Sequence, residues 1–519
     1  MQDPRRRGSP DAGCPGLDVT IRVVRIKATD VFDYYKPNKC VRRVALRARG
    51  VPEQETDTAF MALLRKLGHE HEEDHLASLP GVVDLSGPDP AGRERRTLEA
   101  IRSGAAAIYQ ARFRADIELE GEACELVGEP DFLVRIGGGA AYLIRDSKLA
   151  RNVLSGRHEG IQEQLQIYGL LFELAVGEPP AGLEVHSGTG DIVPVPYEGR
   201  ADVLARLRKH RRMREVAPDA YEPVGWSKCG GCGYEDRCWG EAEAAGDVAL
   251  LTLVHQGRAR DLHARGVSTI RQIAAAVDDP AHRDYFWTGQ KEPRRKDFVA
   301  ALLRSAEAYL SNTDIPVAPP SLPSARNAAM FDLEGLPFSI DDLEKVYLWG
   351  VKVFGDKPSG YLPAQAGFGP DCDCEGWFAF LEVARRLLAD YGPDLPFVHW
   401  SSYEKTKLNL YVDRFGDRDG VAARVLVNLV DLLAVTKASV VTPLPSYSLK
   451  VIEGHVGFRR RLTEADGAWS MAKYIEATES ADPAARDAIV AEILAYNEED
   501  LDATRAVMEW LRSLPAPAG

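Results

Sequence analysis

Residues 128–150 read GEPDFLVRIGGGAAYLIRDSKLA, and this stretch decides the fold expected for the first half of the chain. Two runs rich in apolar and β-branched residues flank the glycines at 137–139, a pattern typical of a β-hairpin. Side chains alternate between the two faces of a strand, so we expect Asp146 and Lys148 on the same face. Asp131 opens the first run, and strand pairing can bring it near the end of the second. The stretch therefore predicts two carboxylates and a lysine at one end of a sheet.

Carboxylates placed in this way bind hard cations such as Mg²⁺ through oxygen. A bound cation lowers the pKa of a water ligand and neutralises charge that builds up on a phosphate. Lys148 beside it could steady the attacking hydroxide or the phosphate oxygens. The alternative is a surface hairpin with an exposed ion pair, because D-x-K is short and common. This stretch alone leaves both interpretations open.

The whole chain has 519 residues, 45% of them hydrophobic, which is enough for two or three domains with cores of their own. The formal net charge of -14 excludes a uniformly basic surface but not local patches that contact phosphate. Residues 1–17 are polar and rich in Pro, Gly and Arg, so we expect a disordered tail rather than a signal peptide. There is no run of ~18 apolar residues, so we expect no membrane span.

The chain has eight cysteines, too few for a disulfide scaffold, and three of them form the pattern C-x2-C-x5-C at Cys229, Cys232 and Cys238. A zinc ribbon would normally add a second C-x2-C pair or nearby histidines. Three thiolates with a distant fourth suit a 4Fe-4S cluster, and Cys40 is the natural fourth ligand. Such a site would connect both ends of one domain in a reducing, cytoplasmic compartment. A zinc site and unligated cysteines are the alternatives.

Two helices expected in the N-terminal half carry further candidate residues. The helix expected over residues 56–78 holds His71, for which a structural role is the alternative to metal binding. The amphipathic helix over residues 160–177 places Gln164 and Tyr168 four residues apart on one face. Such a pair is also common without any function.

Further along, the run RLRKHRRMR at residues 206–214 holds six cations. They form either a solvated helix face or a track for a phosphate backbone, and the track would use Arg208, Lys209, Arg211 and Arg212. Residues 241–315 read as helix, turn and helix and are loosely similar to helix–hairpin–helix modules, with a plain helical linker as the alternative. The Pro-rich residues 316–325 are expected to form an interdomain linker.

The chain then restarts with a second set of acids. Asp332 and Glu334 alternate with apolar residues, so both should project from one strand face. Glu404 stands near the start of a helix, and a late helix places Tyr496 and Asp500 four residues apart. If these acids converge, they would bridge two divalent cations ~4 Å apart, with Tyr496 positioning the attacking water. Asp431 in the segment NLVDLL is a competing third acid.

Residues 27–240 resemble the RecB-type branch of the PD-(D/E)XK nucleases, in the subset with an iron–sulfur cluster. The motifs stand in the family's order: GHEH with His71, EPD with Asp131, DSK with Asp146 and Lys148, QLQIY with Gln164 and Tyr168, and an upstream cysteine before C-x2-C-x5-C. The resemblance implies a restriction-endonuclease-like fold and cleavage of DNA that depends on Mg²⁺ or Mn²⁺. It also implies that His71 is an added metal ligand, and that Gln164 and Tyr168 contact DNA or orient the lysine.

The C-terminal segment resembles the DEDD exonucleases of the RNase H-like superfamily, specifically the RNase H-like domain found behind iron–sulfur RecB-like nucleases. DLE and YNEED supply the first and last motifs, and HWSSYE stands where that superfamily usually has HN…FD. Glu404 would there replace an aspartate. The segment SYSLKVIEGHVGF resembles the family's S-L-K segment, in which Lys450 would meet phosphate. A degenerate domain kept for DNA binding is the alternative.

Together these features predict an α/β protein with a disordered tail over residues 1–17 and four further segments: a PD-(D/E)XK domain over 18–240, a small helical module over 241–315, a linker over 316–325 and an RNase H-like domain over 326–515. The predicted function is a metal-dependent DNA nuclease of repair or recombination that acts on DNA with single-stranded character. The chain shows no P-loop motif, so a separate helicase would be its partner. The alternatives are one active site with the other domain as a clamp, and a non-catalytic DNA-binding adaptor.

Overall fold

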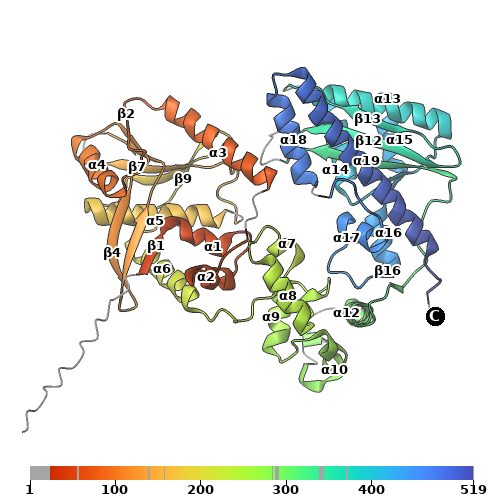
Figure 1. Ribbon diagram of the computed structural model, residues 1–519, viewed down its shortest axis with the longest axis horizontal. Coiled ribbons are helices and arrows are strands. Elements are labelled where there is room, and N and C mark those ends of the chain that lie inside the picture. The colour runs from red at the N-terminus through yellow and green to blue at the C-terminus, as the bar shows by residue number, and fades with distance from the viewer. Residues whose placement is uncertain are drawn as a thin grey trace, which may run out of the picture.

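The computed structural model describes residues 24–54, 58–137, 141–156, 158–282, 285–286, 292–337, 344–369, 372–463 and 465–517. An α/β N-terminal part, a helical part and an α/β C-terminal part follow one another along the chain (Figure 1). The predicted tail and two glycines of the hairpin loop, at 138 and 139, lie outside these residues. Among the helices described, none combines the length and the apolar character that crossing a bilayer requires.

The N-terminal part contains two sheets with helices packed against them. A six-stranded sheet has the order β2-β3-β6-β7-β8-β9, and a three-stranded sheet has the order β1-β5-β4. The strands are β1 (Val24–Lys27), β2 (Val82–Asp84), β3 (Ala107–Tyr109), β4 (Phe113–Leu119), β5 (Glu122–Gly128), β6 (Phe132–Arg135), β7 (Tyr142–Ser147), β8 (Gly182–His186) and β9 (Ile192–Val195). The α-helices are α1 (Phe32–Tyr35), α2 (Val41–Ala48), α3 (Ala59–Ser78), α4 (Pro90–Ser103), α5 (Glu159–Val176), α6 (Arg200–Glu215), α7 (Trp226–Cys229) and α8 (Glu235–Ala245), and η1 (Ala28–Val31) is a 3₁₀ turn.

The predicted hairpin is present as β6 and β7, which pair antiparallel with Phe132 opposite Arg145. β8 pairs parallel with the other edge of β7, so β7 lies inside the sheet. Helix α5 packs closely on the end of β5 because Gly128, the last residue of that strand, lacks a side chain. A Cβ atom at Gly128 would lie 2.6 Å from Leu171 Cδ1. This close contact fixes the helix that carries Gln164 and Tyr168.

The helical part follows the cysteine-rich segment. Its elements are η2 (Val248–Leu250), α9 (Gln256–Ala264), η3 (Ile270–Gln272), α10 (Ile273–Asp278), η4 (Pro280–His282) and α12 (Glu292–Ser311). Buried apolar residues such as Leu262, Ile273 and Leu302 form its core, and Cys229 and Cys238 pack against this core. The cysteine-rich segment is therefore one of the contacts between the N-terminal and helical parts, and Asn38 Nδ2 donates to Gln256 Oε1 at another.

The C-terminal part contains a five-stranded sheet with the order β13-β12-β11-β14-β15. Its strands are β11 (Asn327–Gly335), β12 (Val346–Gly355), β13 (Tyr361–Gln365), β14 (Phe397–His399) and β15 (Leu429–Asp431), and the short strands β10 (Ile315–Pro316) and β16 (Val440–Val441) pair with each other. Its helices are α13 (Asp373–Tyr391), α14 (Tyr403–Phe415), α15 (Val421–Val427), α16 (Leu432–Ser439), α17 (Leu449–His455), α18 (Gly467–Glu479) and α19 (Pro483–Ser513).

The two faces of β11 pack against different layers. Phe331 and Leu333 join the core formed with α13 and α14, whereas Met330 joins the core that includes Leu501 of α19. Because side chains alternate along a strand, Asp332 and Glu334 face the α19 layer. The long helix α19 crosses in front of the sheet (Figure 1).

The Pro-rich segment predicted as a linker is packed on the C-terminal part. β10 pairs antiparallel with β16, and the N–H of Val317 donates to the carbonyl of Ser439 at 2.8 Å. Leu322 packs against the core that contains α19. Residues 316–325 thus connect two parts of the chain while lying against one of them.

Candidate active sites

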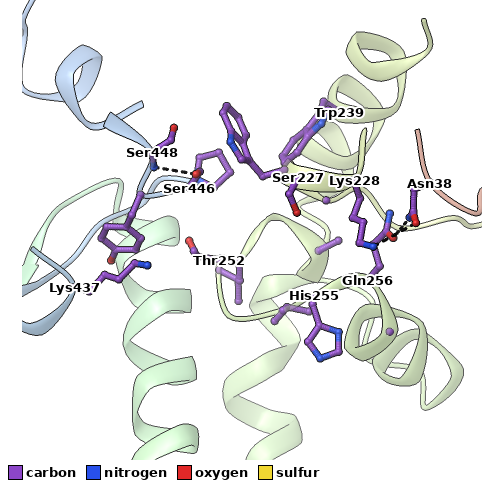
Figure 2. Close-up of a pocket in the computed structure, with 18 of the residues that line it drawn as sticks. Asn38, Ser227, Lys228, Trp239, Thr252, His255, Gln256, Lys437, Ser446 and Ser448 are labelled. Carbon is purple, nitrogen blue, oxygen red and sulfur yellow. Dashed lines mark hydrogen bonds between the residues drawn. The ribbon is translucent and has the colours of Figure 1, made fainter. Parts of the chain in front are cut away.

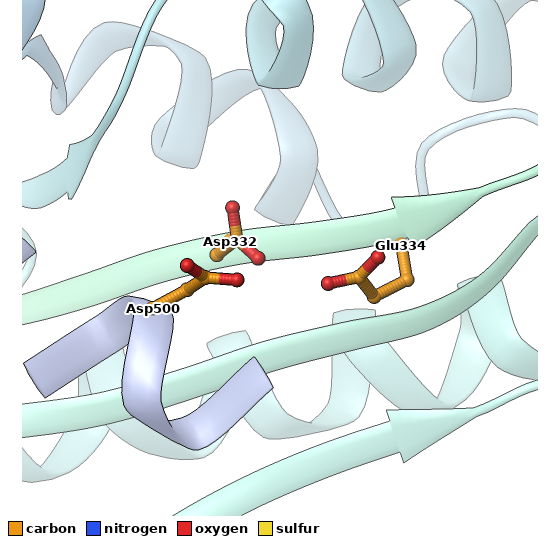
Figure 3. A group of neighbouring side chains, drawn as sticks. All are labelled: Asp332, Glu334 and Asp500. Atoms are coloured by element: carbon orange, nitrogen blue, oxygen red, sulfur yellow. The ribbon is translucent and has the colours of Figure 1, made fainter. Parts of the chain in front are cut away.

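Three carboxylates converge between β11 and α19 (Figure 3). Asp332 and Glu334 project from the strand and Asp500 from the helix, and one oxygen of each lies within 4.8 Å of the others. Asp332 and Glu334 are two residues apart on β11, so their side chains lie on the same face of the strand, and α19 covers that face. Carboxylate oxygens in such a group are the ligands that Mg²⁺ and Mn²⁺ prefer. The structure therefore contains a candidate metal site at this point.

Burial and mutual repulsion change the acidity of this group. Burial is the main cause of the raised pKa of Glu334, which reaches about 8, and the Asp500 carboxylate adds to it. Burial also holds the pKa of Asp332 well above its usual range, with repulsion from Asp500 and Glu334 as the next causes. A divalent cation would favour the ionised forms. The metal-free site therefore retains protons that a bound cation would displace.

Two polar side chains that the sequence analysis missed contact these acids. Asn497 Nδ2 donates to Asp332 Oδ2 at 2.7 Å. Arg460 Nη2 donates to Asp500 Oδ1 at 2.5 Å, and the same guanidinium holds both oxygens of Glu453. Asn497 stands three residues before Asp500, so helical spacing could have found it. Arg460 lies outside the regular elements, and no sequence signal marked it.

Glu404 is the fourth predicted acid, and the structure buries it at the start of α14. Its Oε2 lies 3.1 Å from His399 Nδ1, and its charge is one of the causes that raise the pKa of Asp332. The competing acid, Asp431, instead caps helix α16, where its Oδ1 accepts the N–H of Ala434 at 3.0 Å. The geometry therefore favours Glu404 over Asp431 as the additional acid.

Tyr496 and Lys450 lie at the border of the acid group. Tyr496 is hydrogen-bonded to the Asp500 carboxylate, and burial followed by the charge of Asp500 raises the pKa of its phenol. It is therefore a neutral donor beside the acids. The ammonium group of Lys450 donates a hydrogen bond to the carbonyl of Ala465. The phosphate contact predicted for Lys450 would have to replace this bond.

A second group of charges lies where the β6–β7 hairpin ends. Lys148 Nζ is 2.6 Å from Asp146 Oδ2 and 3.9 Å from Asp131 Oδ2. The backbone N–H of Ser147 donates to Asp131 Oδ2 at 2.8 Å, which fixes that carboxylate. Burial alone would lower the pKa of Lys148, but the two carboxylates outweigh it and raise the pKa above its usual value. The structure thus brings together two acids and a charged lysine.

A cleft with a volume of about 520 Å³ lies beside this group, and Asp146, which is fully buried, does not line it. Asp131, Lys148, Gln164 and Tyr168 all line it. Gln164 Nε2 donates to the hydroxyl of Tyr168 at 2.6 Å, and both side chains are buried. Helix α5 therefore presents its polar pair to the same cleft as Asp131 and Lys148.

One comparison with known proteins covers the C-terminal part of the chain. Residues 329–512 match the family model of the RNase_H superfamily. The C-terminal part is an RNase H-like domain. It is therefore a domain of the phosphodiester-hydrolase, or nuclease, type.

Other comparisons add little to this match. No curated protein matches the chain. One solved protein, described as "Crystal structure of SSO0001", covers 41% of this chain and 85% of its own at 15% identity, with a TM-score of 0.22. A likeness of that strength carries no argument about function.

His71 lies near the hairpin acids but does not reach them. Its ring stacks on that of His186 with centroids 4.0 Å apart, and its Nε2 is 3.4 Å from the His186 carbonyl. Among the described residues, no ligand group within 4.8 Å combines His71 with Asp131 and Asp146. The predicted metal contact of His71 would need the ring to turn from this position.

Glu72, which follows His71 on α3, was missed by the sequence analysis. Its Oε1 accepts from the hydroxyl of Tyr109 at 2.9 Å and from Gln110 Nε2 at 2.7 Å. Its charge is among the causes that raise the pKa of Asp131. Glu72 is therefore a third acid in the electrostatic surroundings of the hairpin site.

The four cysteines predicted to bind a cluster meet at one small cavity. Cys40, Cys229, Cys232 and Cys238 all line a space of about 30 Å³, and none of these four forms a disulfide. Burial is the main cause that raises the pKa of Cys40 to about 12 and that of Cys229 to about 11. Thiolates at this place need a positive group to neutralise them. Four sulfur donors lining one half-buried space fit a thiolate-ligated metal group, and among the described residues no three of these sulfur atoms lie within 4.8 Å of one another.

The basic run on α6 is largely paired with acids. Arg211 is only 4% exposed and donates to Glu122 and Glu215. Arg212 lies 3.2 Å from Glu120. A phosphate contact of Arg211 would have to replace these bonds, because its guanidinium is buried and already paired, and the contact predicted for Arg212 stays a prediction. Contacts of Arg208 and Lys209 with nucleic acid stay predictions.

Proposed function

We propose that this protein is a metal-dependent nuclease that hydrolyses phosphodiester bonds in DNA with single-stranded character. The observation that carries the proposal is the convergence of Asp332, Glu334 and Asp500 within 4.8 Å inside an RNase H-like domain. Cleavage of DNA with single-stranded character would serve DNA repair or recombination. A separate helicase would supply the opened strands.

In the RNase H-like domain, the three carboxylates would hold Mg²⁺ or Mn²⁺, which lowers the pKa of water and neutralises charge on the phosphate. Asn497 keeps the Asp332 carboxylate in one orientation through its 2.7 Å hydrogen bond. Tyr496, as a neutral donor bonded to Asp500, is suited to orient a water molecule. Arg460 adds a fixed positive charge beside the acids.

The N-terminal site would act as a second nuclease centre of the PD-(D/E)XK type. Its support is the placement of Asp131 and Lys148 on the wall of one cleft, with the buried carboxylate of Asp146 2.6 Å from Lys148 Nζ. The two acids would hold the cation, and the charged lysine would steady the attacking hydroxide or a phosphate oxygen. Gln164 and Tyr168 would orient the lysine or contact the DNA.

The four cysteines would hold a 4Fe-4S cluster with a structural role, since they join residue 40 to residues 229–238 around one cavity. Zinc bound to the same thiolates is the alternative. An absorption spectrum after anaerobic purification distinguishes the two metals, because thiolate-ligated iron absorbs near ~400 nm and thiolate-ligated zinc does not.

The experiment that tests the proposal is digestion of end-labelled single- and double-stranded DNA with Mg²⁺ or with Mn²⁺. Lys148→Ala and Asp332→Ala should each remove one set of products, and the double variant should remove all of them. Lys357→Ala, an exposed lysine of the C-terminal domain, is the control and should cleave like the wild type. A wild type that cleaves no DNA with either cation would overturn the proposal.

A single active site is the second candidate function, and Arg460 favours it. Its guanidinium already holds Asp500, so the C-terminal acids are partly neutralised without a cation. In that case the RNase H-like domain would serve as a clamp for nucleic acid. Loss of every product in Lys148→Ala alone would establish this version.

A further inference from the structure

A groove lies where the three parts of the chain meet, and Figure 2 shows the side chains that line it. Its volume is about 940 Å³. Asn38 comes from the N-terminal part, Thr252 from the helical part and Ser446 from the RNase H-like domain. The hydroxyl of Thr252 donates to the carbonyl of Leu444 at 2.8 Å, which ties two of the walls together.

The charge of this groove is opposite to that of the chain. The net charge is -14, yet among the described residues that line the groove none is Asp or Glu. The cations on its walls are Lys39, Lys228, Arg260 and Lys437. Lys228 and Lys437 are exposed and come from opposite walls (Figure 2). Lys39 pairs with Glu159 and Arg260 pairs with Glu222, so Lys228 and Lys437 carry the positive charge that is complementary to an anionic polymer.

Aromatic rings line the same groove. Trp226, Trp239, Trp400 and Tyr447 line the groove. Trp226 is 45% exposed, although a large apolar ring gains from being covered. Aromatic rings that stack bases, combined with cations that track phosphates, are the combination by which proteins bind single strands.

The groove also adjoins both candidate sites. Trp400 and Ser401 line it, and both precede Glu404 in the loop between β14 and α14. At the other wall, Asn38 and Lys39 follow Lys36, whose pKa is lowered first by burial and then by the nearby charge of Lys148. A strand lying in the groove would therefore contact segments that lead to residues of both sites.

We propose that this groove binds a single-stranded nucleic-acid segment, with bases stacked on Trp226 and Trp400 and phosphates held by Lys228 and Lys437. The inference rests on the proposed function, because it names the site that holds the strand to be cut. The alternative occupant is a protein segment. The core of a protein–protein interface is depleted in charged residues, whereas this groove carries lysines, so its lining favours nucleic acid.

The inference is tested by measuring the binding of labelled oligothymidylate to the full chain by fluorescence anisotropy. EDTA in the buffer removes divalent cations and so prevents cleavage. Trp400→Ala and Trp226→Ala should each weaken binding about tenfold, and Trp400→Phe should keep most of the affinity. Lys437→Gln should reduce the slope of log affinity against log salt by about 0.7. Lys357→Gln, which lies outside the groove, is the matched control and should change neither quantity. The two tryptophans lie on different parts of the chain, so misfolding of one variant leaves the other as a test.

A small chromogenic diester, bis(4-nitrophenyl) phosphate, separates this inference from the proposed function because it is too small to span the groove. The groove variants should hydrolyse it at the wild-type rate with Mn²⁺ while they bind oligothymidylate more weakly. Unchanged oligothymidylate affinity in both tryptophan variants and in Lys437→Gln overturns the groove and leaves the nuclease proposal standing. A wild type that fails to bind oligothymidylate also overturns it and leaves a protein segment as the occupant. A wild type that hydrolyses neither diester nor DNA refutes the proposed function instead.

Discussion

Replacing Glu334 by glutamine should stabilise the metal-free RNase H-like domain and abolish its response to Mn²⁺. Glu334 is 7% exposed and lies within 4.8 Å of Asp332 and Asp500. Burial, and then the charge of Asp500, raises its pKa to about 8. Glutamine keeps the shape of the side chain and cannot ionise, so it removes the electrostatic cost together with a metal ligand.

The sign and size of the effect follow from proton linkage. The folded domain binds the Glu334 proton more tightly than the unfolded chain, whose pKa is near 4.5. The stability due to this group is therefore complete below pH ~4.5 and is lost as the pH rises toward ~8. Each pH unit in that window costs at most about 1.4 kcal/mol. At pH ~7 the wild type has thus lost up to about 3 kcal/mol, and the variant has not.

Differential scanning calorimetry in EDTA between pH ~5 and ~8 measures this difference. For a domain of about 150–250 residues, about 2–4 °C per kcal/mol predicts that the variant melts roughly 6–12 °C higher at pH ~7 and only slightly higher at pH ~5. Mn²⁺ should raise the melting temperature of the wild type but not that of the variant. Glu509→Gln, an exposed acid on α19, is the control. A Glu334→Gln variant that melts at or below the wild-type temperature at every pH would refute the reasoning.

Three more predictions concern the packing of the acid group, the lysine and the cluster. In Gly350→Ala the new Cβ would lie 1.8 Å from Asn497 Oδ1, so the Asn497 side chain should lose its hydrogen bond to Asp332. Cleavage of end-labelled DNA by the RNase H-like domain should then fall at least about tenfold, because a positioning contact is lost. Unchanged cleavage rates would contradict this. Lys148→Met should remove the N-terminal products while calorimetric titration still detects Mn²⁺ at Asp131 and Asp146; surviving products would exclude a catalytic lysine. Cys229→Ser should lower both iron content and melting temperature, and a cluster-free variant that unfolds like the wild type would show that the cysteines do not stabilise the domain.

Local sequence patterns predicted the elements that carry the two groups of acids. The alternation of apolar and polar residues around Asp332 and Glu334 gave the strand and the shared face, and the structure has both. The glycine-separated runs around Asp131 and Asp146 gave the hairpin. These predictions depend only on the period of a strand and on turn chemistry, which short segments encode.

Contacts between distant segments could not be predicted in the same way. Arg460 reaches Asp500 from a segment 40 residues earlier, and Glu72 reaches Tyr109 across 37 residues. Both depend on how whole elements pack. Arg211 shows the opposite case, since a run that reads as an exposed basic face has one arginine turned into the core to meet Glu122. Sequence period alone does not reveal which cation a distant acid will neutralise.

The central claim is that acids in each half of the protein hold divalent cations for phosphodiester hydrolysis. Anomalous diffraction from crystals grown with Mn²⁺ tests it most directly. The account predicts manganese peaks between Asp332, Glu334 and Asp500 and beside Asp131 and Asp146. Crystals that carry no manganese at either group, at a concentration that supports cleavage in solution, would contradict it.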